Sequence, residues 1–374
     1  MSGGLYWSFV LGAATVSLLA GLIYLTVCVG RFQGIRKLSG GSGGRRFLLS
    51  LGIIAAVFAL LAFAMSMINA VVVFLHAVLI FLLFGLGVRL AGKLTGRQFR
   101  ANWQGWLALA FTLVYLTGAY ISCNHVRQKD YVLTTEKRLG TLKIALIADS
   151  HLGTTFDGDG FGEHLKQIEA QSPDLLVITG DFVDDWSRRE DLEKACAALG
   201  ETKFPFGVWY VYGNHDAGSF SHRDFSLSEL EEALRSCGVH VLADQWEEVD
   251  GRFIVAGRKD ASMSAFRGSR KDASDLLAGA DGDKYIVLLD HQPSDYDSEA
   301  LSPADLVLSG HTHGGQLIPI TYVGKWFGIV DREYGYERRE GTDFIVTSGI
   351  SDWALQFKTG ARSEYVLITV EGKT

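Results

Sequence analysis

Long apolar runs without charge dominate the first 122 residues. Leu5–Val29 has about the 20 residues that a helix needs to cross a bilayer. Phe47–Val88 carries no charge and is about twice that length, so it predicts two spans joined by a turn near Asn69. Trp103–Ser122 predicts a further span. The pattern therefore predicts a four-helix transmembrane domain over residues 1–124, with spans at 5–29, 47–67, 70–88 and 103–122.

The pattern changes after residues 125–140, which we interpret as a linker. Short β-branched runs then alternate with polar stretches that have helical periodicity. The expected strands are LKIALIA, DLLVITG, GVWYVYG, RFIVAG, KYIVLLD, DLVLSG, DFIVTSG and YVLITV. The expected helices lie around 161–171, 188–199, 227–236 and 270–278. Continuous apolar strands of this kind are typical of sheets covered on both faces, so residues 141–374 predict a layered α/β domain, a β-sandwich flanked by helices.

Charge divides the chain in the same way. Residues 1–129 contain 11 Lys and Arg and no Asp or Glu, whereas the remainder holds 24 basic residues and all 42 acidic ones, a formal charge of −18. An acidic domain is a poor nonspecific partner for phosphate backbones, so no nucleic acid is expected to bind.

The basic residues of the first region indicate an orientation in the membrane. The loops 31–46 and 89–102 carry five and four basic residues, and such loops stay on the cytoplasmic side. Four crossings then place the acidic domain on the extracytoplasmic face of the cell membrane. Arg127 and Lys129, just after the last span, argue against this orientation.

Several polar residues of the chain receive a structural interpretation. His76 has no acidic partner within residues 1–129 and is interpreted as hydrogen-bonded inside the helical bundle. The four cysteines fit neither a disulfide scaffold nor a zinc finger, and whether Cys196 and Cys237 pair stays open. The stretch DREYGYERRE at 331–340 is interpreted as a solvated loop, with the rim of a substrate pocket as the alternative.

Five of the expected strands end in side chains that bind metals. The fragments are ADSH with Asp149 and His151, GDFVDD with Asp181, GNHD with Asn214, His215 and Asp216, DHQP with His291, and GHTH with His311 and His313. In α/β folds the carboxyl ends of strands collect ligands from remote parts of the chain. Five such ends in one domain predict a common site. Asp290 is interpreted as a surface carboxylate, and Asp184 is left open between a helix cap and a contact behind the ligands.

These fragments, in this order, resemble the signature of the calcineurin-like metallophosphoesterase superfamily, which reads D-x-H, G-D-x-x-D, G-N-H-[DE], a lone His and G-H-x-H. The resemblance covers about residues 142–370 and extends to the membrane-linked bacterial members. It implies a first metal bound by Asp149, His151 and His313, and a second bound by Asn214, His291 and His311. Asp181 would bridge the two ions. His215 would act in catalysis, and Asp216 would orient it.

The ligand types agree with this chemistry. Carboxylate, imidazole and amide groups suit divalent ions such as Mn, Fe or Zn. Two such ions can clamp phosphoryl oxygens and activate a water molecule. The sequence therefore predicts a membrane-anchored phosphohydrolase acting on a phosphomonoester, phosphodiester or pyrophosphate bond, with a lipid-linked or envelope phosphate as the preferred substrate. One alternative is a cytoplasm-facing hydrolase of UDP-diacylated sugars, and another is a non-catalytic membrane scaffold or sensor.

Overall fold

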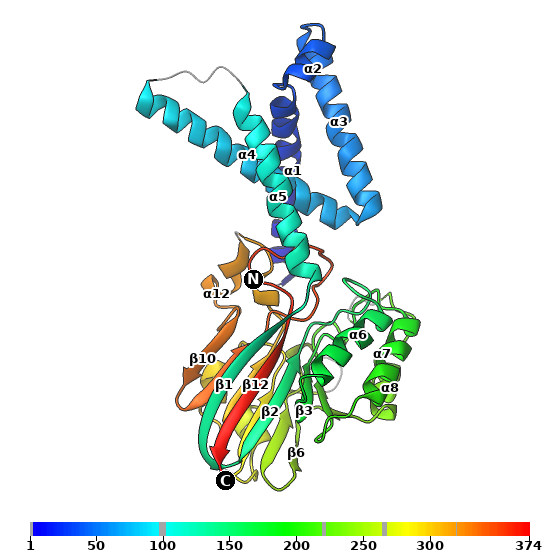
Figure 1. Ribbon diagram of the computed structural model, residues 1–374, viewed down its shortest axis with the longest axis vertical. Coiled ribbons are helices and arrows are strands. Elements are labelled where there is room, and N and C mark those ends of the chain that lie inside the picture. Colours follow the sequence, from blue (N-terminus) through cyan, green and yellow to red (C-terminus); the bar gives the residue numbers. More distant parts are fainter. Residues whose placement is uncertain (1–2, 97–101, 219–221, 264–267, 319) are drawn as a thin grey trace. The chain divides into compact units, whose positions relative to one another are not determined.

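The computed structural model describes residues 3–96, 102–218, 222–263, 268–318 and 320–374 (Figure 1). The chain divides into two compact units, Met1–Ala119 and Tyr120–Thr374. Each unit has its own apolar core, so each is described by itself.

The first unit is helical. Its elements are α1 (Gly3–Val29), α2 (Gln33–Leu38), α3 (Gly43–Ala64), α4 (Met67–Thr95) and α5 (Trp103–Asn124), whose last turn belongs to the second unit. Leu25, Phe74 and Phe81 pack in a core between helices. Many other apolar side chains point outward, and Phe63 is 93% exposed. An apolar outer surface of this kind is stable in lipid and is an aggregation hazard in water.

Among the described residues, three helices are long and apolar enough to cross a membrane, namely α3, α4 and α5. The expected count of four spans is therefore not confirmed. The described apolar part of α1, Thr15–Val29, is shorter than such a span. The turn between the second and third expected spans lies at Met65–Ser66, because the Ser66 hydroxyl caps α4 by accepting from the Asn69 backbone amide. Asn69 itself is a buried residue of α4.

The described part of the second unit forms two mixed sheets of six strands each. The first has the order β1 (Arg127–Arg138), β12 (Glu364–Lys373), β2 (Thr141–Ile147), β3 (Leu175–Thr179), β4 (Val208–Val211) and β5 (Val239–Leu242). The second has the order β10 (Gly335–Arg339), β11 (Thr342–Val346), β9 (Leu306–Ser309), β8 (Tyr285–Leu289), β7 (Phe253–Gly257) and β6 (Gln245–Val249).

The sheets pack face to face, and helices cover their outer faces. Ile144 and Ile368 of the first sheet share one buried cluster with Val255 and Leu289 of the second. The helices α6 (Gly158–Glu169), α7 (Arg189–Glu201) and α8 (Leu227–Ser236) pack on the first sheet (Figure 1). The short helices α10 (Ala273–Leu276) and α11 (Tyr296–Ala300) cover the second sheet. The expected layered α/β architecture is thus present.

Two segments differ from their sequence interpretation. Most of the expected linker forms β1, which pairs in parallel with β12 from Arg127↔Glu364 onward. Leu133 of β1 joins the core between the sheets, while neighbouring charged side chains stay exposed, as at the edge of a sheet. Part of the expected loop at 331–340 forms β10, which pairs with β11. The many charged residues of these two edge strands hid the apolar pattern by which a strand is predicted.

Candidate metal centre

The candidate ligands all follow the ends of central strands. Asp149 and His151 follow β2, Asp181 follows β3, Asn214 follows β4, His291 follows β8, and His311 and His313 follow β9. β2, β3 and β4 are parallel neighbours in one sheet, and β8 and β9 are parallel neighbours in the other. Their carboxyl ends therefore meet at one edge of the sandwich.

The backbone at these strand ends is tightly constrained. Asp149, Asp181, His311 and His313 adopt left-handed conformations with φ between 50° and 72°, which non-glycine residues rarely adopt. Such outliers cluster at functional sites, where the surrounding structure holds them. Gly310 is required beside them, because a Cβ there would lie 2.7 Å from a carboxylate oxygen of Asp149.

The ligands form two adjacent groups. Asp149, His151 and His313 make the first group and Asp181, His291 and His311 the second, and the ligand atoms within each group lie within 4.8 Å of one another. The Asp181 Oδ2 atom lies 3.1 Å from His291 Nε2 and 3.7 Å from His151 Nε2. Asp181 therefore stands between the groups, in the position that a bridging carboxylate would occupy.

Asn214 belongs with the second group. Its Oδ1 atom lies 3.2 Å from His291 Nε2. The backbone amide of the next residue, His215, donates to Asp181 Oδ1 over 2.8 Å. The turn after β4 thus brings the Asn214 amide beside the second group and also positions a hydrogen-bond donor to the central carboxylate.

The chemistry of the donor set fits metal ions. Both ring nitrogens of His151 are buried and lack a hydrogen-bond partner among the described residues, an arrangement that costs free energy unless something else binds them. Burial lowers the pKa of His151 and of His311 to about 3, so both imidazoles are neutral, as ligation requires. Burial opposes ionisation of Asp181, but the charge of His291 holds the pKa of that carboxyl well below its usual range.

The His215 ring faces Asp184 and not Asp216, which was the expected partner. Its Nδ1 atom lies 3.3 Å from Asp184 Oδ1. The carboxylate of Asp216 instead accepts backbone amides of Val183 and Gly213 at 3.1 and 2.8 Å. In the structure Asp184, rather than Asp216, therefore faces the His215 ring. The orienting role expected of Asp216 stays a prediction, and the contact makes Asp184 a second candidate for it.

Sequence reasoning missed a second carboxylate, Asp352. Its Oδ1 atom lies 2.9 Å from His313 Nδ1, and it also accepts the side-chain amide of Gln316 over 2.6 Å. Asp352 is fully buried, and the thiol of Cys123 lies 3.7 Å from its other oxygen. No motif precedes Asp352 in the sequence, so only its isolated position in the apolar stretch GISDWAL could have drawn attention to it.

Asp290 is fully buried, so its interpretation as a surface carboxylate is wrong. The guanidinium of Arg258 donates to Asp290 over 3.0 Å and to Glu299 over 2.9 Å, and Arg270 also contacts Asp290. This ion network therefore includes the residue that directly precedes His291 in the chain.

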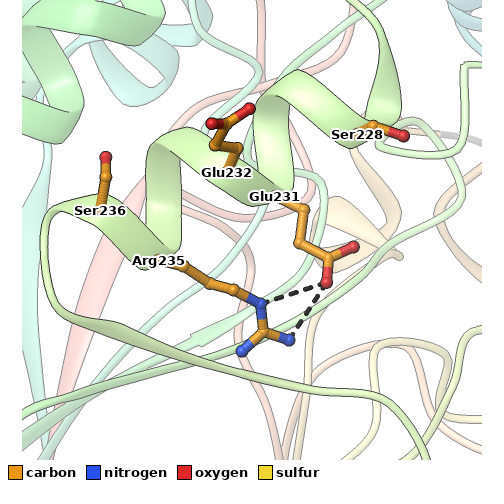
Figure 2. Close-up of a pocket in the computed structure, with 5 residues that line it drawn as sticks. All are labelled: Ser228, Glu231, Glu232, Arg235 and Ser236. Atoms are coloured by element: carbon orange, nitrogen blue, oxygen red, sulfur yellow. Dashed lines mark hydrogen bonds and ion pairs between the residues drawn. The ribbon is translucent and has the colours of Figure 1, made fainter.

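Other candidate residues lie outside the centre. Cys196 and Cys237 are free thiols. In the first unit, His76 Nδ1 lies 2.8 Å from the Val72 carbonyl oxygen, which agrees with a role inside the bundle. A surface depression on α8 is lined by Ser228, Glu231, Glu232, Arg235 and Ser236 (Figure 2). It contains exposed charged side chains and an i,i+4 ion pair, and none of the candidate ligands.

Comparison with known proteins identifies the family. Residues 142–315 match the family model of the calcineurin-like phosphoesterases. A metallophosphoesterase from Aquifex aeolicus is 31% identical over 268 residues, which are 70% of this chain and 98% of that protein. The chain belongs to the calcineurin-like metallophosphoesterases. It is therefore a metal-dependent phosphoesterase, as the motif order predicted.

Other similar proteins combine this domain with a membrane region. A transmembrane protein with a metallophosphoesterase domain from Danio rerio is 29% identical over 323 residues, 79% of this chain and 71% of that protein. Together with the apolar helices, this similarity indicates membrane association. Among solved structures, a dimetal phosphatase from Danio rerio matches 56% of this chain and 87% of its own chain at 12% identity, with a TM-score of 0.37.

Proposed function

We propose that the protein is a multi-pass membrane phosphohydrolase with a two-ion centre, which cleaves a phosphomonoester, phosphodiester or pyrophosphate bond of a lipid-linked or envelope phosphate. The observation that carries the proposal is the position of Asp181 between two complete ligand groups. A single carboxylate shared by two clusters of imidazoles is an arrangement for two cations.

The residues divide into two sets of ligands. Asp149, His151 and His313 would hold one ion, Asn214, His291 and His311 would hold the other, and Asp181 would contact both. Their oxygen and nitrogen donors suit Mn, Fe or Zn. When bound, such ions supply Lewis-acid polarisation of phosphoryl oxygens and acidify water for in-line attack.

His215 is the proposed proton donor to the leaving oxygen. Asp184 faces its Nδ1 atom, which leaves Nε2 as the atom that carries the transferable proton. Burial opposes protonation of the ring, but the hydrogen bond that the ring donates to Asp184 and the charge of Asp181 raise the pKa of His215 to about 9. A protonated imidazole at neutral pH suits a general acid.

The ligand set can be tested by removing one imidazole. We expect His313→Ala to lose metal from the first group and to lose metal-dependent hydrolysis of a chromogenic phosphoester. The measurement is turnover by full-length protein in detergent, together with elemental analysis of bound metal. His240→Gln is the matched control, because His240 lies on β5 away from the ligands and stacks on Trp209. Undiminished turnover by His313→Ala would contradict the proposal.

The side of the membrane is a separate part of the proposal. The basic loops favour an extracytoplasmic domain, and Arg127 and Lys129 favour the cytoplasm, where a UDP-diacylated sugar would be the substrate. Protease added to intact cells digests an outward domain and spares an inward one. Protection in intact cells, with digestion after lysis, would refute the outward orientation and leave the hydrolase assignment unchanged.

A further inference from the structure

The second unit carries a concentrated apolar surface on one short segment. Ile318, Tyr322, Trp326, Phe327 and Ile329 are between 49% and 75% exposed, and we call these five side chains the aromatic patch. They lie on η3 (Ile320–Tyr322), on α12 (Val323–Trp326) and in the flanking turns (Figure 1). The rings of Tyr322 and Trp326 lie 6.1 Å apart. Exposed apolar clusters of this kind mark sites of interaction.

The aromatic patch is attached to the loop of the metal ligands. His313–Gly315 form the turn η2, and the buried residue Thr321 of η3 packs on this turn so closely that a Cβ at Gly315 would collide with it. Gly360 packs closely on Thr321 as well, because a Cβ added at Gly360 would lie 2.8 Å from the Thr321 hydroxyl oxygen. The patch and His313 are therefore parts of one packed structure.

The same structure reaches the end of the helix α5. The backbone amides of Thr359 and Gly360 donate to the Gln316 carbonyl oxygen at 2.8 and 3.2 Å. A few residues earlier, the Gln356 carbonyl oxygen accepts the side-chain amide of Asn124 over 3.4 Å, and Phe357 contacts Tyr120 edge to face. The segment 352–360 thus joins the last turn of a candidate membrane span to the loop that carries the patch.

The position of the aromatic patch and the residue types in it together indicate that a lipid bilayer covers it. α5 is a candidate membrane span, and its last turn would be the point where the chain leaves the bilayer. A surface attached to that turn is therefore expected at the level of the lipid head groups. Trp and Tyr concentrate at this level because their rings are apolar and their polar atoms stay hydrated, and a Lys such as the exposed Lys325 places its charge among phosphates.

We infer that the aromatic patch inserts into the bilayer surface and holds the metal centre at the head groups, so that the substrate is a phosphate ester or anhydride of a bilayer lipid. The inference rests on the proposed function for its chemistry, whereas the membrane contact of the patch stands by itself. The aromatic patch would position the domain at the bilayer surface, and the candidate metal ligands would hold the ions needed for hydrolysis.

The contact is tested by fluorescence quenching of full-length protein in lipid nanodiscs, with lipids brominated near the head group. Trp326 and Trp186 are equally exposed, at 73%, and Trp186 lies outside the patch, so Trp186→Phe is the matched control. We expect Trp326→Phe to remove a large part of the quenched signal and Trp186→Phe to remove none. Equal quenching in wild type and Trp326→Phe, or equal losses from the two variants, would overturn the membrane contact.

The consequence for the substrate is tested with Trp326→Glu combined with Phe327→Glu. We expect turnover of a lipid phosphate in nanodiscs to fall at least tenfold and turnover of a soluble chromogenic phosphoester to be unchanged. An equal effect on both substrates overturns the inference. If two copies occupy each nanodisc in wild type and one in the double variant, a second copy covers the patch and the inference is also overturned.

The two failures are distinguishable. Absence of soluble phosphoester turnover from the wild type contradicts the proposed function, whatever the quenching result. Normal soluble turnover without quenching at Trp326 contradicts only the membrane contact.

Discussion

The two ligand groups are held from behind in different ways. In the second group, the outer nitrogen of His291, Nδ1, lies 2.7 Å from the backbone carbonyl oxygen of Thr179. In the first group, the outer nitrogen of His313, also Nδ1, lies 2.9 Å from the carboxylate of Asp352. A backbone carbonyl oxygen orients an imidazole by a hydrogen bond. This hydrogen bond remains when the side chain of the same residue is substituted. A carboxylate also increases the basicity of the ring, so the first group is the one that a single residue can tune.

The largest effect is expected where the two groups meet. Asp181→Ala removes the carboxylate between them and leaves two cations without a shared counter-charge, so both groups should lose metal. We expect turnover to fall by at least about 1,000-fold, as for the loss of an electrostatic stabiliser at the reacting centre. Elemental analysis and turnover of the purified variant check this result. Loss of only one metal equivalent would show that Asp181 serves a single group.

The next effect separates acid catalysis from metal binding. Asp184→Asn keeps the shape of the side chain but removes the charge that faces His215. We expect kcat to fall by about 100-fold, within the range for general acid catalysis, with bound metal and KM little changed. Steady-state kinetics and metal content provide the measurement. A variant that loses metal along with activity would place Asp184 among the ligands, since it also lies near His151.

The difference between the two groups is tested directly by Asp352→Asn. Removing the charge behind His313 should weaken metal binding by about 10–100-fold at one of the two sites. Thr179→Val is the matched control, because His291 contacts the backbone of Thr179 and that carbonyl remains. Titration of metal-free protein with Mn²⁺ measures both affinities. Unchanged binding in Asp352→Asn would mean that the two groups are equivalent.

The smallest effect on turnover is expected at Asp216. Burial raises its pKa to about 6, above the value of about 4 in an unfolded chain. Folding therefore favours the protonated carboxyl, and this contribution to stability is full below about pH 4 and is lost as pH rises through 6. Asp216→Asn cannot ionise, so relative to wild type the variant should gain stability between pH 4 and 7. Urea unfolding across this pH range measures the change in stability. We expect kcat to stay near that of the wild type. A kcat of Asp216→Asn as low as that of Asp184→Asn would show that Asp216 does act in catalysis.

Much of the architecture could be read from local patterns. The eight apolar runs from LKIALIA to YVLITV all coincide with strands, because a strand buried on both faces must be continuously apolar. The edge strands β1, β6 and β10 were missed for the opposite reason, and the short edge strand β5 was missed as well. A strand that is solvated on one side carries charges, as in RQKDYVLTTEKR, and becomes a strand only when it finds a neighbour to pair with.

The family, the enzyme class and the residue types at the ends of the strands could all be predicted from short motifs. Each motif is short, and its spacing dictates which side chains leave the same strand end. Which carboxylate faces which imidazole became evident only in the folded protein. Asp216 is adjacent to His215 in the chain and turns away, whereas Asp184 and Asp352 reach His215 and His313 from other loops. Contacts of this kind depend on how separate loops converge at the edge of the sandwich, and no local pattern encodes that convergence.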